Sequence, residues 1–219
     1  IDGKVFHPDR FSTKVCEYFN ADEVNDSMCG VSNHYIVRTS LKRNPDDYDL
    51  AGFCVGIVSQ KKIICPSRVK NGNIILGISS NGFHSNGYSL INKLIERKRL
   101  NLQTKIGTTS IGQILIKPTK LYTDIVAMLL KKVKVHGLAH ITGGGITDNL
   151  PRIVPKGLCA SINLKSLKIP RIFRYVQEQS KISDEEMLKT FNCGIGMVAI
   201  IDKNNLTLAH KLMKNYKYS

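Results

Sequence analysis

The sequence predicts an α/β or α+β fold in which a mixed β-sheet is flanked by helices. Short apolar runs that suit buried strands alternate with segments whose apolar residues recur at helical spacing. Turns rich in Gly, Ser and Asn separate several of these segments, and no internal repeat or low-complexity block interrupts them. Because strands and helices alternate along the chain, we expect helices to pack on a shared sheet.

The first predicted elements follow one another closely. Residues 50–58 and 73–78 are continuous apolar runs and predict two buried strands. A Gly/Ser/Asn-rich turn at 79–87 comes directly after the second run. Apolar residues then recur at helical spacing from Tyr88, which predicts a helix to about Arg97.

The remaining elements continue this alternation. An S-x-x-E capping box starts at Ser183 and predicts the first turn of a helix, and Pro118 suits the start of another. We predict strands over 135–141, 158–164 and 195–201, and helices over 119–132, 148–153, 171–179, from 183, and over 206–216.

The chain changes character near residue 46. Residues 1–45 are polar and mixed and contain no recognisable motif, whereas the regular alternation begins after them. We therefore divide the chain into an N-terminal segment, 1–45, and a second domain, 46–219.

Composition narrows the function classes. The net charge of +15 is scattered along the chain, Trp is absent and no nucleic-acid-binding module is visible, so a nucleic-acid partner is not favoured. No apolar stretch approaches the roughly 20 residues needed to cross a bilayer. Six cysteines without a C-x-x-C pair predict a reducing compartment and no zinc site.

The turn at 79–87 is the strongest candidate for a phosphate site. Glycine permits a close backbone approach, Ser and Asn add donors, and the turn leads into a helix N-terminus that favours anions. Gly82 and Gly87 have the spacing of a P-loop, but Tyr88 stands where its Lys must be, so a P-loop NTPase is excluded.

Two further glycine-rich loops adjoin predicted strands. His140 leads into Thr142 and three consecutive glycines, whose entropic cost a close approach to a ligand would explain. For His140 a structural role and a functional role both stay open. In the third loop, 191–197, Cys193 has no recognisable base partner and is interpreted as an unreactive thiol.

Four segments stand out in order along the chain. They are Asp-Tyr-Asp-Leu-Ala-Gly-Phe at 47–53, Ser-Asn-Gly-Phe-His-Ser-Asn-Gly-Tyr-Ser-Leu at 80–90, His-Ile-Thr-Gly-Gly-Gly at 140–145 with Asn-Leu-Pro-Arg at 149–152, and Glu-Met at 186–187 with Thr-Phe-Asn-Cys-Gly-Ile-Gly-Met at 190–197. Taken together and in this order, they resemble phosphoribosylformylglycinamidine cyclo-ligase (aminoimidazole ribonucleotide synthetase), mainly its C-terminal half.

The resemblance implies a cytoplasmic ligase of purine biosynthesis. Members close the imidazole ring: ATP phosphorylates the amide oxygen of formylglycinamidine ribonucleotide, an amidine nitrogen attacks that carbon, and phosphate leaves. Mg²⁺ neutralises the ATP phosphates. Residues 46–219 then correspond to the substrate-binding domain, and a homodimer is expected where the family's N-terminal half is present.

The resemblance also implies site residues. Either His84 or His140 would transfer a proton or stabilise developing charge, and the sequence does not distinguish between the two residues. Asp47 and Asp49 are the candidate Mg²⁺ ligands, because Mg²⁺ prefers oxygen. The residues expected to bind substrate or phosphate are Ser80, Asn81, Gly82, Ser85, Asn86, Gly87, Thr142, Gly143, Gly144, Gly145 and Asn192.

Alternatives remain open. The nucleotide-binding motifs of the family's first half are not found before Asp46, so the chain could be a non-catalytic substrate-binding or scaffold remnant of the same fold. Related enzymes, namely selenophosphate synthetase, thiamin-monophosphate kinase and the glutamine-dependent purine amidotransferase, are disfavoured by the pairing of His-Ser-Asn-Gly with Phe-Asn-Cys-Gly-Ile-Gly-Met.

Overall fold

The computed structural model describes residues 31–37, 49–56 and 58–216, with side chains for 56 and 58–216. The chain divides into two compact units, Ile1–Ile63 and Ile64–Ser219. The boundary predicted after residue 45 and the candidate ligand Asp47 lie outside the described residues, so both stay predictions.

The first unit contains an antiparallel hairpin. Strand β1 (Val31–Val37) pairs with β2 (Asp49–Val55), with Val31 opposite Val55 and Val37 opposite Asp49. Strand β2 confirms the strand predicted from residue 50, and it ends at Val55 rather than at residue 58. Asp49, the second candidate metal ligand, is the first residue of β2.

The second unit is built on a three-stranded sheet in the order β3-β7-β6. The strands are β3 (Ile74–Ser79), β7 (Ile195–Ile201) and β6 (Val135–His140), which confirms three predicted strands. The α/β class is confirmed, and the described strand pairs refine the expected mixed sheet because all of them are antiparallel. The central strand β7 therefore runs opposite to both neighbours.

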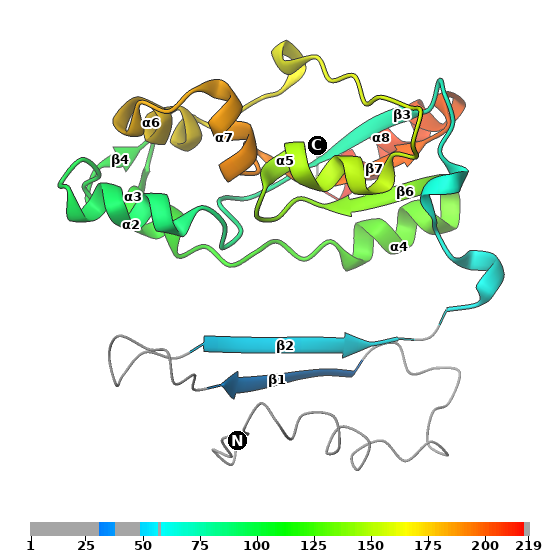
Figure 1. Ribbon diagram of the computed structural model, residues 1–219, viewed down its shortest axis with the longest axis horizontal. Coiled ribbons are helices and arrows are strands. Elements are labelled where there is room, and N and C mark those ends of the chain that lie inside the picture. Colours follow the sequence, from blue (N-terminus) through cyan, green and yellow to red (C-terminus); the bar gives the residue numbers. More distant parts are fainter. Residues whose placement is uncertain (1–30, 38–48, 57, 217–219) are drawn as a thin grey trace. The chain divides into compact units, whose positions relative to one another are not determined.

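Helices cover both faces of this sheet (Figure 1). Alternate residues of β7 point to opposite faces, so Ala199 and Ile201 join one core while Val198 joins another. The first core packs under α4 (Thr123–Lys132) and α8 (Leu206–Asn215). The second packs under α5 (Gly145–Asn149) and the 3₁₀ turn η5 (Leu150–Ile153).

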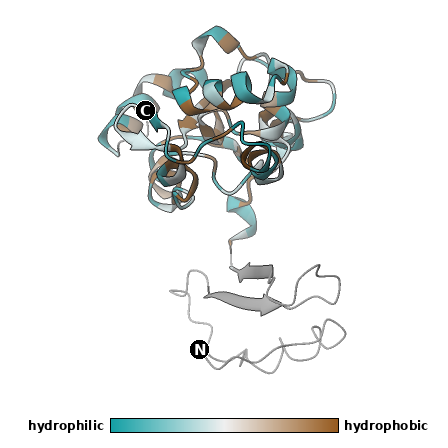
Figure 2. Cartoon of the chain, turned by 90° about the vertical axis from the view of Figure 1, so that its left-hand side faces the viewer, coloured by the Kyte–Doolittle hydropathy of each residue, from teal (hydrophilic) through white to brown (hydrophobic). Residues whose placement is uncertain are grey.

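A third core joins the remaining helices. Phe83, from the turn after β3, is buried in it, with ring centroids 4.7 Å from Phe173 and 5.3 Å from Phe191. The helices carry both hydrophobic and hydrophilic residues (Figure 2), as amphipathic packing requires. The elements of this region are α2 (Tyr88–Glu96), α3 (Ile111–Leu115), α6 (Arg171–Ser180), α7 (Asp184–Thr190), and the short strands β4 (Lys105–Ile106) and β5 (Thr109–Ser110).

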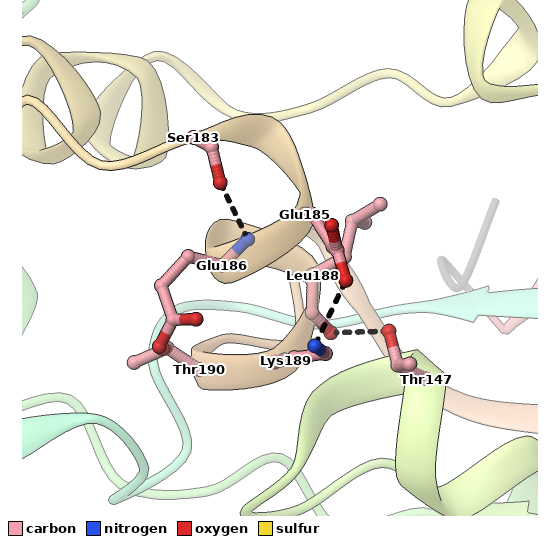
Figure 3. A network of polar contacts seen from close by, with 7 residues as sticks. All are labelled: Thr147, Ser183, Glu185, Glu186, Leu188, Lys189 and Thr190. Atoms are coloured by element: carbon pink, nitrogen blue, oxygen red, sulfur yellow. Dashed lines mark hydrogen bonds and ion pairs between the residues drawn. The ribbon is translucent and has the colours of Figure 1, made fainter.

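Helix α7 is fixed at its start and along its side (Figure 3). Ser183 Oγ accepts from the Glu186 backbone N–H at 3.2 Å, which confirms the N-cap half of the predicted capping box. The Glu186 carboxylate accepts from Thr190 Oγ1 at 3.4 Å. Thr147 Oγ1 on α5 donates to the Leu188 carbonyl at 3.3 Å. The exposed Glu185–Lys189 pair, at 2.9 Å, adds little because water screens it. Helix α7 thus supports α5 and the loop before it.

Two predicted elements differ in the structure. The strand predicted over 158–164 was wrong: the segment forms no strand, and the 3₁₀ turn Leu164–Ser166 begins at its end. Its alternation places Ala160 and Ile162 against the core below α5, and none of the described strands pairs with it. The helix predicted from residue 119 begins at Thr123. Hydrogen bonds from Lys120 and Tyr122 hold residues 119–122 against the end of β3 and the turn after it.

Two smaller differences concern short helices. The helix predicted over 148–153 begins earlier, at Gly145, and continues as the turn Leu150–Ile153. Helix α3 was not predicted, although Ser110 and Gln113 form a reciprocal capping box that the sequence displays as S-x-x-Q. None of the described helices has the length and apolar character to span a membrane.

The core under α4 gives a direct test of this packing. Leu129 is fully buried, whereas its neighbour Leu130 is 48% exposed. We expect Leu129→Ala to lower the free energy of unfolding by about 2–5 kcal/mol and Leu130→Ala to change it by less than about 1 kcal/mol. Denaturant unfolding measures both. Equal losses in the two variants would show that α4 does not pack as described.

Candidate functional site

Three glycine-rich loops meet at one end of the sheet. Because β7 runs opposite to β3 and β6, the ends of β3 and β6 lie beside the start of β7. The Ser80 N–H donates to the Gly194 carbonyl at 2.9 Å, and the Ile141 N–H donates to the Gly196 carbonyl at 2.9 Å. Loops that lie far apart in the sequence are therefore hydrogen-bonded neighbours.

The side chain of Asn192 ties the first loop to the third. Its Oδ1 accepts from Ser80 Oγ at 3.0 Å and from the Gly194 N–H at 2.9 Å. Its Nδ2 donates to the Gly82 carbonyl at 2.8 Å. With 2% exposure, Asn192 satisfies backbone groups that would otherwise be buried without partners. Its predicted contact with a ligand stays a prediction.

The second loop is shaped by Asn149, which was not predicted as a site residue. Its Nδ2 donates to the carbonyls of Gly143 at 3.1 Å and Gly145 at 2.7 Å, and Thr142 Oγ1 donates to its Oδ1 at 3.2 Å. Gly145 has a φ of 56°, and a Cβ there would collide with the Leu188 carbonyl oxygen. The loop consequently needs glycine at this position.

The first and second loops face one another across a short gap. A Cβ added to Gly143 would lie 3.6 Å from Asn86 Oδ1 and would meet no closer atom. Asn86 Nδ2 in turn donates to the His84 carbonyl at 2.6 Å. The structure thus brings together two loops that the sequence analysis predicted as ligand-binding. The position of a Cβ on Gly143 faces the turn that contains His84 and Asn86.

His84 is the most constrained residue of the site. It is 4% exposed and adopts a left-handed φ of 52°. Its Nε2 lies 2.6 Å from Asn81 Oδ1 and within hydrogen-bond distance of the backbone N–H groups of Asn81 and Lys120. Its Nδ1 is buried without a partner among the described residues, so either tautomer leaves one ring nitrogen unsatisfied. A bound ligand could supply the missing hydrogen bond.

The surroundings of His84 keep its ring neutral. Burial, followed by the charges of His140 and Lys120, lowers the pKa of His84 to about 4. At neutral pH the imidazole therefore carries one N–H donor and one lone pair. This protonation state suits hydrogen bonding to a neutral or anionic ligand.

Tyr122 lies between the two candidate histidines. Its ring meets His84 and His140 edge-on, with centroid distances of 6.0 and 5.9 Å, and its hydroxyl donates to the Ser79 carbonyl at 2.9 Å. His140 is the more exposed histidine, and partial burial lowers its pKa as well. A side chain at Gly196 would collide with the Tyr122 hydroxyl, which accounts for that glycine.

Sequence reasoning missed Lys120 and Tyr122 because both lie in a segment predicted as helix. Pro118, two residues before Lys120, was the one available signal that the helix starts irregularly. Nothing in the spacing of the sequence indicated that Lys120 contacts His84, about 36 residues earlier.

The structure does not test the metal assignment. No group of three or more His, Cys, Asp or Glu side chains that could hold a metal ion occurs within the described part of the chain. The side chains of Asp47 and Asp49 lie outside that part.

Comparisons with known proteins identify relatives of this chain. Residues 70–218 match the family described as "AIR synthase related protein, C-terminal domain". A protein of Lawsonia intracellularis named phosphoribosylformylglycinamidine cyclo-ligase is 46% identical over 175 residues, which are 79% of this chain and 50% of that protein. The resemblance predicted from the four sequence segments is confirmed.

Two further relatives carry the same name. The protein of Methylobacillus flagellatus is 44% identical over 167 residues, which are 76% of this chain and 48% of that protein. The protein of Nitrosococcus oceani is 43% identical over 169 residues, which are 77% of this chain and 47% of that protein. The chain thus spans about half the length of these curated relatives.

The Asn192 contacts predict a large cost of truncation. Asn192→Ala leaves the Gly82 carbonyl and the Gly194 N–H without partners, so we expect the free energy of unfolding to fall by about 2–4 kcal/mol. Asn92→Ala, on the exposed face of α2, should change it by less than about 0.5 kcal/mol. Denaturant unfolding compares the two variants. A loss at Asn192 no larger than at Asn92 would contradict the bridging role.

The low pKa of His84 predicts acid-sensitive stability. Between pH 6.5 and about 4 the unfolded chain binds a proton at His84 that the folded chain does not, so stability falls as pH decreases through this range. We expect the advantage of the wild type over His84→Asn, which tolerates positive φ, to shrink by at most about 3 kcal/mol. Unfolding at a series of pH values measures it, and parallel profiles would contradict burial of a neutral ring.

Proposed function

This chain belongs to the AIR synthase related protein family, as a C-terminal domain, and on that premise we propose that it forms the substrate-binding part of an ATP-dependent cyclo-ligase. The proposed reaction converts formylglycinamidine ribonucleotide into aminoimidazole ribonucleotide. The names of the relatives support this reaction class. The observation that carries the proposal is the meeting of two glycine-rich loops beside a buried His84 with an unsatisfied ring nitrogen.

The first loop supplies a place for phosphate. Helix α2 begins after Gly87, which has a φ of 77°, and neither a side-chain cap nor an acidic residue occupies its first turn. The helix has nine residues, and the positive end of its dipole, at the N-terminus, is directed at the loop. This N-terminus favours an anionic group of the ribonucleotide. Ser80, Asn81, Gly82, Ser85 and Asn86 belong to the same proposed contact surface.

The second loop supplies close backbone approach. Gly143 has no atom within 3.6 Å of the position where its Cβ would lie, whereas Gly145 is closely packed. Gly143 is therefore the glycine whose small size serves a ligand, and Gly145 is required by the fold. Thr142 and Gly144 complete the surface on the side of α5.

The two histidines take different roles in this proposal. A pKa of about 4 makes His84 a weak base at neutral pH, so it orients the substrate by hydrogen bonding. His140 is exposed at the end of β6 and exchanges protons readily with water. It accepts the proton that the attacking amidine nitrogen loses when the carbon–nitrogen bond forms.

The proposed ring closure needs no covalent enzyme intermediate. ATP transfers its γ-phosphoryl group to the amide oxygen of the substrate, and ADP leaves. An amidine nitrogen then forms a bond to the amide carbon, the carbon–oxygen bond breaks, and inorganic phosphate and a proton are released. Such chemistry depends on positioning and charge stabilisation. Mg²⁺ accompanies the ATP phosphates, and a cytoplasmic location and a homodimer belong to the same proposal.

Calorimetry with formylglycinamidine ribonucleotide tests the proposal. We expect saturable binding by the chain, and Gly143→Ala should weaken it about tenfold or more without changing the free energy of unfolding, because the added methyl occupies the ligand's space. Gly112→Ala in α3, whose methyl would contact only Leu102, is the control and should keep the affinity.

Product formation separates the two candidate functions. Aminoimidazole ribonucleotide formed in the presence of ATP and Mg²⁺ supports the cyclo-ligase, whereas binding without product at any concentration favours a substrate-binding protein that lacks the chemistry. An absence of binding to the folded wild type contradicts both.

A further inference from the structure

The side chain of Asp148 lies against the middle glycine of the second loop. Its Oδ2 and its Cβ are each 2.6 Å from the position that a Cβ on Gly144 would occupy, so any side chain there would collide with Asp148. Gly144 has a φ of 89°, a conformation that favours glycine. The sequence analysis did not select Asp148, yet the fold places its carboxylate on the loop that contains Gly143.

The carboxylate of Asp148 has acceptor positions available. Asp148 is exposed, and its carboxylate takes part in no hydrogen bond and no ion pair within the described part of the chain. Helix α5 begins after Gly144 without a side-chain hydrogen bond at its cap, so Asp148 does not serve as that cap. Because an ionised carboxylate can accept about four hydrogen bonds, a ligand at the second loop would find these oxygens unpaired.

Lys189 on α7 is a cation that responds to the charge of Asp148. The pKa of Lys189 is raised, chiefly by its hydrogen bond to Glu185 and to a smaller extent by the charges of Glu186 and Asp148. Its ammonium already donates to Glu185 at 2.9 Å. Lys189 is therefore engaged by another acid, and the Asp148 oxygens stay open to a cationic group of a ligand.

The two facing loops differ in the charge that they favour. Helix α2 has no acidic residue in its first turn, so its free N–H groups favour an anion at the first loop. The first turn of α5 instead carries Asp148, whose carboxylate repels an anion and attracts a cation. The candidate site thus has an anion-binding side at residues 79–87 and a cation-binding side at residues 142–148.

The proposed substrate has a matching polarity. Formylglycinamidine ribonucleotide carries a phosphate on one side of its ribose and an amidine on the other. An amidine is protonated at neutral pH, and its planar N–H groups match a carboxylate as those of a guanidinium do. Such charge-assisted hydrogen bonds are about twice as strong as neutral ones. The ribose hydroxyls can also donate to a carboxylate, but they carry no charge, so the amidine is the favoured partner.

We propose that the Asp148 carboxylate binds the amidine of the substrate and so makes the site prefer an amidine to the corresponding amide. The inference rests on the proposed function and names one specificity-determining contact within it. Adjacent Cα atoms lie about 3.8 Å apart, so a ligand packed on Gly143 passes close to the carboxylate on Gly144. With its phosphate at the first loop, the substrate presents its opposite end to Asp148.

Calorimetry with two ligands tests this contact. The ligands are formylglycinamidine ribonucleotide and its amide analogue, in which a carbonyl oxygen replaces the amidine N–H. We expect the wild type to bind the amidine about tenfold more tightly than the amide, or better. Asp148→Asn keeps the shape but removes the charge, and should reduce this preference to less than about threefold. Asp148→Glu returns a carboxylate and should restore part of the preference.

Asp184→Asn is the matched control. Asp184 is also an exposed aspartate in the first turn of a helix, in this case α7. We expect this variant to keep the preference within about twofold of the wild type. Because Asp148 also lies near the positive end of the α5 dipole, denaturant unfolding is measured for every variant. A purely structural role would weaken both ligands together and leave the preference intact.

The inference and the proposed function fail in different ways. Equal binding of both ligands by the wild type overturns the inference, and so does a folded Asp148→Asn that keeps the preference or loses both ligands by the same factor. The proposed substrate still stands in those cases. A preference that depends on Asp148, without product in the presence of ATP and Mg²⁺, supports the contact and contradicts catalysis by this chain. Absence of binding of either ligand to the folded wild type contradicts both proposals.

Discussion

The carboxamide of Asn192 is the interaction on which the site depends. Antiparallel pairing brings the ends of β3 and β6 beside the start of β7, but pairing alone does not set the shape of the loops beyond the strands. Asn192 does so by bonding Ser80, Gly82 and Gly194 at once. Since all three bonds are buried or partly buried, the first loop is held in one conformation before any ligand arrives.

Packing then makes this arrangement rigid. Phe83 inserts from the middle of the first loop into the core formed with Phe173 and Phe191. On the other side of the site, Asn149 bonds the carbonyls of the second loop, and α7 supports α5. The polar surface between the loops is thus preorganised by two structural features, a buried amide on each side, which is what positioning chemistry requires.

Much of this could be predicted from the sequence, because the signals were local. Continuous apolar runs indicated β3, β6 and β7, and clustered glycines indicated the loops that the structure brings together. What escaped prediction depends on contacts between distant residues. Lys120 and Tyr122 were assigned to a helix, yet bonds to His84 and Ser79 hold them outside it. The alternation at 158–164 indicated a strand, but no strand within the described part of the chain pairs with it.

Amide NMR of the wild-type chain titrated with formylglycinamidine ribonucleotide tests most directly whether the two loops bind one ligand together. We expect the backbone signals of residues 80–87 and 142–145 to shift at the same ligand concentration and to saturate together, while the signals of α8 stay in place. Saturable binding that shifts only one of these loops, or that shifts a different part of the chain, would contradict a shared site.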